Sequence, residues 1–136
     1  IVKKATNSMG ETVYEGSPLV LREVLTPETA RWLRKAMRDA VVEGTGRRAE
    51  TKVTRLAGKT GTAQVPEGGK YSRHRYVASF IGFWPYEKPR YLMLLSIGEP
   101  TSGRYYGGEL AAPSFRAIVE EMAEVEYYAP GKNDRS

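Results

Sequence analysis

Apolar residues recur at helical spacing in two segments of the chain. The first segment starts at Thr26 and Pro27, which suit the cap and the first position of a helix, and it ends before Gly44. The second starts near Pro113 and follows the i, i+3, i+4, i+7 rule. The sequence therefore predicts two amphipathic helices. Their apolar faces consist of Ala30, Leu33, Met37, Ala40 and Val41 in the first helix and Phe115, Ile118, Val119 and Met122 in the second.

Three segments between these helices have the composition of β-strands, at residues 53–65, 76–84 and 91–97. Residues 66–70 are a predicted loop and residues 85–89 a short turn, so the last two strands predict an antiparallel hairpin. The final strand is an apolar run without polar alternation. Such a run is typical of a strand covered on both faces, so we expect it to be a central strand of a layered fold.

The order of elements indicates the fold class. Residues 1–15 form a predicted hairpin, because two short strand-like segments flank turn-forming residues at 7–10. Residues 100–108 are a predicted loop before the last helix. The order hairpin, helix, three strands, helix predicts an α+β fold in which helices cover an antiparallel sheet.

Composition and charge exclude several classes of functional site. The chain has 136 residues, 40% hydrophobic and 27% charged, which suits one folded domain and excludes wholesale disorder. It has no cysteine and one histidine, His74, which excludes a disulfide scaffold, a cysteine nucleophile and a multi-histidine metal site. No apolar run reaches the roughly 20 residues that span a bilayer. The net charge of +5 leaves a nucleic-acid-binding domain as an alternative, although no aromatic residues interleave with the basic face of the first helix.

The most informative motif is Gly58-Lys59-Thr60-Gly61-Thr62, and it has two interpretations. One is a phosphate-binding P-loop. That motif requires an earlier glycine where this chain has Val53, and it must open into a helix at the phosphates. The glycines and proline that follow do not favour a helix, so the sequence argues against this interpretation.

The other interpretation is a Lys-Thr-Gly strand that lines an acyl-transfer site. Lys59 supplies a positive charge for an anionic substrate group, and the Thr60 hydroxyl can donate to a carboxylate. Gly61 leaves room for a peptide-like ligand, and Thr62 can offer its backbone N–H to a developing oxyanion. A lone triplet of this kind also occurs by chance, as a strand end with a surface lysine.

Five segments, in order, make the chain resemble the C-terminal part of class B penicillin-binding proteins, the D,D-transpeptidases of bacterial division and elongation. The central segment is Ala-Gly-Lys-Thr-Gly-Thr-Ala-Gln at 57–64, which is similar to the family's third active-site motif with its flanks. The other four lie at 25–30, 41–46, 79–83 and 106–115. The resemblance covers most of the chain.

The resemblance implies a fold, an activity and a division of the chain. Residues 1–126 would be the C-terminal portion of a penicillin-binding-protein and β-lactamase-like transpeptidase fold, incomplete without upstream residues, and residues 127–136 a polar tail. The parent protein would be a serine D,D-transpeptidase that crosslinks peptidoglycan stem peptides through an acyl-serine intermediate and binds penicillins. No cofactor and no metal are implied.

The resemblance also implies roles for the motif residues. Lys59 would act in catalysis and in substrate binding, and the Thr62 N–H would be one donor of the oxyanion hole. Thr60 and Thr62 would hold the terminal carboxylate of the peptide or of a β-lactam. Gly61 would be small because the ligand lies over it.

One departure from the family is large. The family's nucleophile lies in a Ser-x-x-Lys motif, followed by a Ser-x-Asn motif, and no serine of this chain begins either. The chain starts with Ile1 rather than Met. We therefore expect a piece of a longer protein, with the nucleophile upstream and the chain alone inactive. A non-catalytic β-lactam-binding or sensor relative is the alternative.

The resemblance implies partners and a compartment as well. The partners would be the peptidoglycan stem peptide, β-lactam antibiotics and the missing N-terminal part of the same protein, and not nucleic acid. The strand at 91–97 would lack its N-terminal partner strand, which predicts a homodimer or a strand swap of the isolated chain. The compartment would be the outer, periplasmic face of the cell membrane, reached through an anchor upstream.

Overall fold

The computed structural model describes residues 2–17, 19 and 21–128, which divide into two compact units, Ile1–Ala30 and Arg31–Ser136. In the first unit, β1 (Lys4–Thr6) pairs antiparallel with β2 (Thr12–Glu15), as the turn chemistry predicts. The side-chain oxygen of Asn7 accepts the backbone N–H groups of Met9 and Glu11 at 3.0 Å each, which fixes the turn.

Helix α1 (Pro27–Val42) confirms the first predicted helix. The Thr26 hydroxyl caps it by accepting the backbone N–H of Thr29 at 3.2 Å, and the helix ends two residues before Gly44. A short 3-10 helix, η1 (Arg47–Ala49), follows, and the hydrophobic pattern did not predict it.

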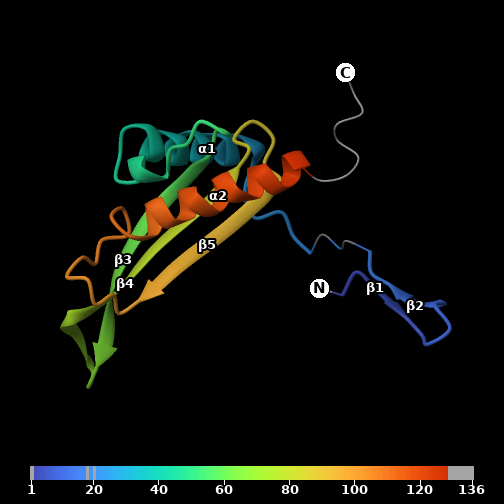
Figure 1. Cartoon of the computed structure of the whole chain (residues 1–136), viewed down its shortest axis with the longest axis horizontal. Helices are drawn as coiled ribbons and strands as arrows, with labels where there is room; N and C mark the ends of the chain where they lie inside the picture. Colours follow the sequence, from blue (N-terminus) through green and yellow to red (C-terminus); the bar gives the residue numbers. More distant parts are fainter. Residues whose placement is uncertain (1, 18, 20, 129–136) are drawn as a thin grey trace. The chain divides into compact units, whose positions relative to one another are not determined.

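The second unit is built on a three-stranded antiparallel sheet with the order β3-β4-β5. Its strands are β3 (Ala57–Glu67), β4 (Lys70–Trp84) and β5 (Tyr91–Gly98). The predicted loop at 66–70 is wrong: Gly68 and Gly69 form a two-residue turn, with φ of +56° and +79° that suit glycine. The strands therefore extend as a two-stranded ribbon beyond β5, toward the lower left of Figure 1.

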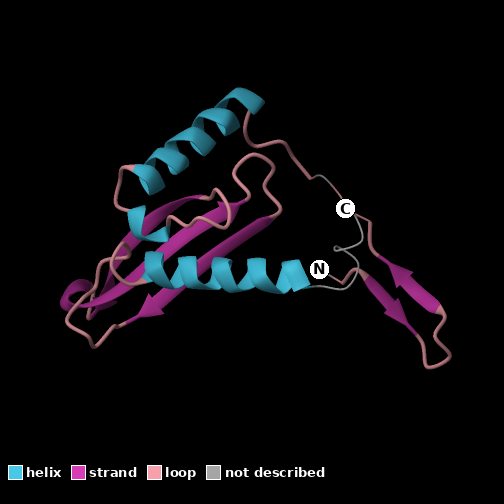
Figure 2. Ribbon diagram, turned by 45° about the horizontal axis from the view of Figure 1, so that its top comes forward, coloured by secondary structure: helices cyan, strands magenta, loops and turns pink. Residues whose placement is uncertain are grey.

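Helix α2 (Ala111–Tyr128) lies across one face of this sheet and forms the core with it (Figures 1 and 2). The Phe115 ring lies 4.7 Å from the Phe80 ring and 5.6 Å from the Trp84 ring, measured between centroids. The helix begins two residues before Pro113 and runs two residues into the segment predicted as a polar tail. Residues 129–136, the rest of that predicted tail, lie outside the described residues.

Within this chain β5 is not the covered central strand that its apolar run predicts, but the unpaired edge strand that the family resemblance predicts. Within the described strands β5 is an edge strand, and its side chains alternate between half-buried and exposed. Leu92 and Leu94 are 71% and 64% exposed, on the face opposite α2. An apolar run shows that a strand avoids water but does not show that this chain supplies the cover on both faces. Among the described residues, neither α1 nor α2 combines the length and the apolar composition of a membrane-spanning helix.

Candidate functional site

The Lys-Thr-Gly motif lies on β3, at the edge of the sheet. Lys59, Thr60, Gly61 and Thr62 are consecutive residues in the middle of this strand, which pairs with β4 alone among the described strands. The P-loop interpretation is wrong, because the motif continues as a strand to Glu67 instead of opening into a helix. An edge strand leaves one row of backbone groups without a strand partner, as a site for an extended peptide requires.

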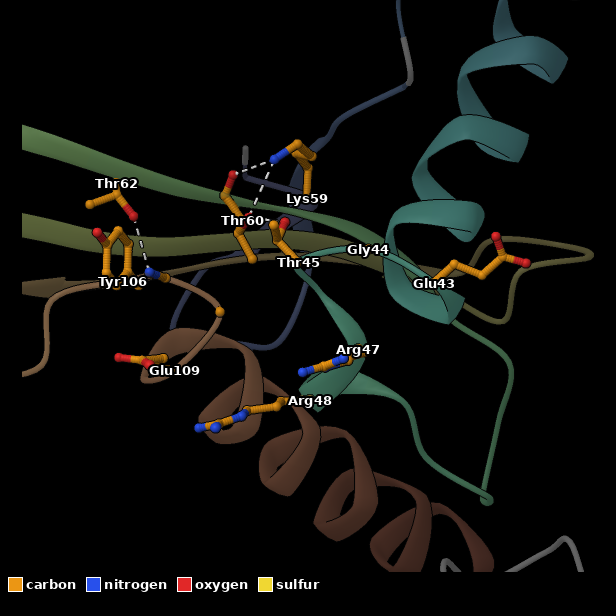
Figure 3. A pocket seen from close by; sticks show the side chains of 12 residues that line it. Glu43, Gly44, Thr45, Arg47, Arg48, Lys59, Thr60, Thr62, Tyr106 and Glu109 are labelled. Atoms are coloured by element: carbon orange, nitrogen blue, oxygen red, sulfur yellow. Dashed lines mark hydrogen bonds between the residues drawn. The ribbon is translucent and has the colours of Figure 1, made fainter.

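The lysine and threonine of the motif are joined to the loop that follows α1 (Figure 3). Lys59 Nζ donates to the Thr60 carbonyl oxygen at 3.0 Å and lies 3.3 Å from Thr60 Oγ1. Thr60 Oγ1 in turn lies 2.7 Å from Thr45 Oγ1, so a hydrogen bond links the two hydroxyls. The ammonium group and two hydroxyls thus form a continuous polar row.

The segment before α2 packs directly on the motif. The Gly107 backbone N–H donates to Thr62 Oγ1 at 3.1 Å. A Cβ on Gly107 would lie 2.4 Å from the carbonyl oxygens of both Gly61 and Ser79, so only glycine allows this approach. A Cβ on Gly108 would lie 2.4 Å from the Thr45 carbonyl oxygen, so this position is equally tight.

Gly61 has a neighbour that the sequence did not predict. A Cβ there would lie 2.5 Å from Ser79 Oγ, on the adjacent strand. A larger residue at position 61 would therefore displace the Ser79 hydroxyl, in addition to meeting the ligand expected from the resemblance.

An open cavity of about 740 Å³ lies beside β3, between the loop after α1 and the start of α2. Lys59, Thr60 and Thr62 line it together with Arg47 and Arg48 (Figure 3). The lining therefore carries the three positive charges of Lys59, Arg47 and Arg48 together with the two carboxylates of Glu43 and Glu109. The remaining lining residues are Glu43, Gly44, Thr45, Tyr106, Gly107, Gly108 and Glu109.

Tyr106, which lines the cavity, belongs to a cluster of three tyrosines. The ring of Tyr105 is stacked on Tyr76 of β4 with centroids 4.2 Å apart, and it lies 4.5 Å from the Tyr106 ring. The hydrogen bond from Tyr105 Oη to Tyr106 Oη, at 3.3 Å, raises the pKa of Tyr105. The two loop tyrosines therefore pack against the sheet that carries the motif.

Sequence reasoning found the motif but missed part of its surroundings. Thr45, Gly107 and Gly108 lie in the family-like segments 41–46 and 106–115, so the resemblance could have marked them. No local pattern marks Arg47 or Arg48. His74 lies on β4 and is exposed. Within the described residues, no cluster of three or more His, Asp or Glu could hold a metal ion.

Most of the chain matches known transpeptidases. A family model described as "Penicillin binding protein transpeptidase domain" matches residues 1–120. The chain is 36% identical over 123 residues to stage V sporulation protein D of Bacillus subtilis, covering 90% of the chain and 19% of that protein. It is 40% identical over 88 residues to the peptidoglycan D,D-transpeptidase FtsI of Buchnera aphidicola, covering 64% of the chain and 15% of that protein.

Solved structures of penicillin-binding proteins match the fold of the chain as well. The apo transpeptidase domain of Burkholderia pseudomallei penicillin-binding protein 3 matches with a TM-score of 0.70 and 33% identity, over 93% of this chain and 37% of that one. Penicillin-binding protein 3 of Mycobacterium tuberculosis, solved with ampicillin, matches with a TM-score of 0.77 and 28% identity, over 96% and 32%. The chain spans about a fifth of the curated relatives and about a third of these structures. It therefore belongs to the penicillin-binding-protein transpeptidase family and forms part of such a domain.

Proposed function

We propose that the chain forms the Lys-Thr-Gly wall of the acyl-transfer site of a peptidoglycan D,D-transpeptidase. The observation that carries the proposal is the polar row of Lys59, Thr60 and Thr45 along the edge of β3, beside an open cavity. A cation and hydroxyl groups along an unpaired strand edge suit an extended peptide that ends in a carboxylate.

Each motif residue has a defined role in this proposal. Lys59 supplies positive charge to the reacting groups, and the hydroxyls of Thr60 and Thr62 hold the terminal carboxylate. Because Thr62 Oγ1 accepts the Gly107 N–H, its own proton is left to be donated to that carboxylate. The Thr62 backbone N–H donates to the carbonyl oxygen as it becomes negative. Gly61 has no side chain, so the peptide can lie directly against β3 at this position.

The reaction needs groups from outside this chain. A serine hydroxyl attacks the carbonyl of the penultimate D-alanine, its proton passes through a base lysine to the departing amine, and the terminal D-alanine leaves. The resulting acyl-serine then transfers the peptide to an amine of a second stem peptide. No Ser-x-x-Lys motif occurs in the chain, so the chain alone is inactive in this proposal. A β-lactam carbonyl would be attacked in the same way and leave a stable acyl-enzyme.

The exposed apolar face of the sheet supports a contact with the rest of the domain. Strand register puts Ile81 opposite Leu94, and they are 39% and 64% exposed beside the 71% exposed Leu92. A contiguous apolar surface of this kind is typical of an interface. We propose that upstream parts of the same protein cover it, and that an anchor among them holds the protein at the outer face of the membrane. A homodimer or strand swap through the β5 edge stays a prediction for the isolated chain.

The test is covalent labelling of a version extended upstream to its Ser-x-x-Lys motif. Intact mass is measured after incubation with a fluorescent penicillin. We expect one adduct per protein on the extended form and none on the 136-residue chain. Lys59→Ala should lower the acylation rate constant at least about 100-fold, because removing a preorganised charge at such a site costs about that much.

Lys70→Ala is the matched control, since Lys70 is an exposed lysine at the hairpin turn, away from the motif. It should label like the wild type. A folded extended protein that takes up no penicillin would overturn the proposal. If it is acylated but never turns over a D-alanyl-D-alanine peptide, the β-lactam sensor is the correct function instead.

A further inference from the structure

Arg75 lies in an irregular stretch of the β3–β4 ribbon. The strand register pairs Gln64 with Tyr76 but Pro66 with Tyr71, so the residues 72–75 all lie opposite Val65. Bulges of this kind re-aim side chains out of the regular alternation of a strand. In this stretch Arg75 pairs with carboxylates of two other segments.

The Arg75 guanidinium binds Glu99 with two parallel hydrogen bonds. Arg75 Nε donates to Glu99 Oε2 at 2.8 Å and Nη2 donates to Glu99 Oε1 at 2.6 Å. Arg75 Nη1 also lies 3.5 Å from Glu67 Oε1, at the end of β3. One side chain thus connects β3, β4 and the residue that follows β5. Two-pronged pairing of this kind fixes geometry better than a single exposed ion pair does.

Glu99 is held in a conformation that needs such support. Its φ is +46°, a left-handed value that residues with a side chain rarely adopt. Its backbone N–H donates to the Tyr76 carbonyl oxygen at 2.8 Å. Glu99 therefore starts the segment 99–107 at a fixed point and in a fixed direction.

That segment leads from the ion pair to the motif. Tyr105 stacks on Tyr76, the neighbour of Arg75, and its hydroxyl bonds that of Tyr106. The segment ends at Gly107, whose N–H binds Thr62 Oγ1. A continuous set of contacts therefore joins Arg75 and Glu99 to the hydroxyl that we assign to carboxylate binding.

We propose that Arg75 and Glu99 are positioning residues whose ion pair holds the segment 99–107 against β3, in the geometry that the ligand of Lys59, Thr60 and Thr62 requires. The inference rests on the proposed function, because it concerns ligand binding at the same site. It assigns neither residue a contact with the ligand.

The test uses three variants of the extended transpeptidase: Arg75→Gln, Glu99→Gln and the double variant. The second-order rate constant of acylation by fluorescent penicillin should fall about three- to fivefold in each of them, the range for loss of one well-formed exposed pair. The double variant should lose no more than a single one, because both single changes break the same interaction.

Hydrogen exchange of the peptide 99–107 supplies a readout that does not depend on penicillin. Exchange should rise by a similar factor in all three variants. The control is the double variant Arg55→Gln and Glu87→Gln. Arg55 and Glu87 form a second exposed ion pair that joins separate segments, so this control should alter neither acylation nor hydrogen exchange.

The outcomes separate this inference from the proposed function. Wild-type protein that is not acylated contradicts the proposed function, and the exchange data then still report on the ion pair. Unchanged acylation in the single variants, losses that multiply in the double variant, or slower acylation without faster exchange would each overturn the positioning role. A loss of the same size in the Arg55 and Glu87 control would do so as well.

Discussion

The two faces of the sheet carry similar apolar side chains but differ in what this chain packs against them. On one face, Phe80 is fully buried beneath Phe115 of α2. On the other, Leu92 and Leu94 are largely exposed in the neighbouring strand. The comparison shows that apolar residues on one face of a strand indicate a contact surface. Which element covers that surface depends on the segments that the chain contains.

The largest expected effect tests the covered face. Phe115→Ala should lower the free energy of unfolding by about 3–5 kcal/mol, because it empties the space between Phe80 and Trp84. Leu94→Ala should cost less than about 1 kcal/mol in this chain, since Leu94 has little surface to lose from the core. Urea denaturation of the two variants measures both values.

Phe115→Ala and Leu94→Ala can also be compared in the transpeptidase that is extended upstream. If upstream residues cover the open face, the cost of Leu94→Ala should rise to about 2–4 kcal/mol there, as for a core leucine. A cost that stays the same in both proteins would mean that this face is solvent-exposed in the parent protein too.

A smaller effect is expected from two glycines of the sheet. A Cβ on Gly58 would lie 2.4 Å from Phe80 ring atoms and 2.7 Å from the Ile81 carbonyl oxygen, so Gly58→Ala should cost about 1–3 kcal/mol. Gly98 has open space at its Cβ position, and Gly98→Ala should be neutral or stabilising by up to about 1 kcal/mol. Thermal unfolding of both variants makes the comparison, and equal losses would contradict the packing described for Phe80.

The smallest expected effect concerns the ion pair of Arg75 and Glu99. Acid breaks this polar contact, whereas it leaves apolar contacts intact. Hydrogen bonding to Arg75 lowers the pKa of Glu99. The ion pair therefore contributes fully above the ordinary carboxyl range, and its contribution is lost as pH falls through the lowered pKa of Glu99. An NMR titration should show the Tyr105 ring signals changing together with the Glu99 carboxyl, while those of Phe115 stay constant. Arg75→Gln should return the Glu99 pKa to its ordinary range.

Periodicity predicted the elements that bury an apolar face within this chain. The spacing of Phe115 and Val119 predicted α2, which buries both residues. Helical spacing also predicted α1, although Val41 is the buried residue of that helix and Leu33 of its predicted apolar face is 37% exposed. The start of β4 was missed because residues 70–75 are mostly polar and form a ribbon whose stability comes from its pairing with β3. The apolar run of β5 alone predicted a covered central strand, which was wrong because β5 pairs only with β4 and its second apolar face has no cover within the described chain.

The site was predictable as a strand but not as a cavity. The motif alone indicated the residues of β3, since the required chemistry lies in consecutive positions. Thr45 and Gly107 reach the motif from 15 and 45 positions away, and only tertiary packing brings them there. Arg47 and Arg48 reach the cavity through a 3-10 turn that no hydrophobic period marks.

The irregular stretch opposite Val65 has a further consequence for the ribbon. Beyond it, the tip of the ribbon joins the sheet through a break in the regular strand register, and such a break bends and twists the strand that carries it. Arg75 lies in this stretch and is linked to Glu67 on the side of the tip and to Glu99 on the side of the sheet. The Arg75 side chain therefore bridges the break, and it connects the tip of the ribbon with the segment that ends at Gly107.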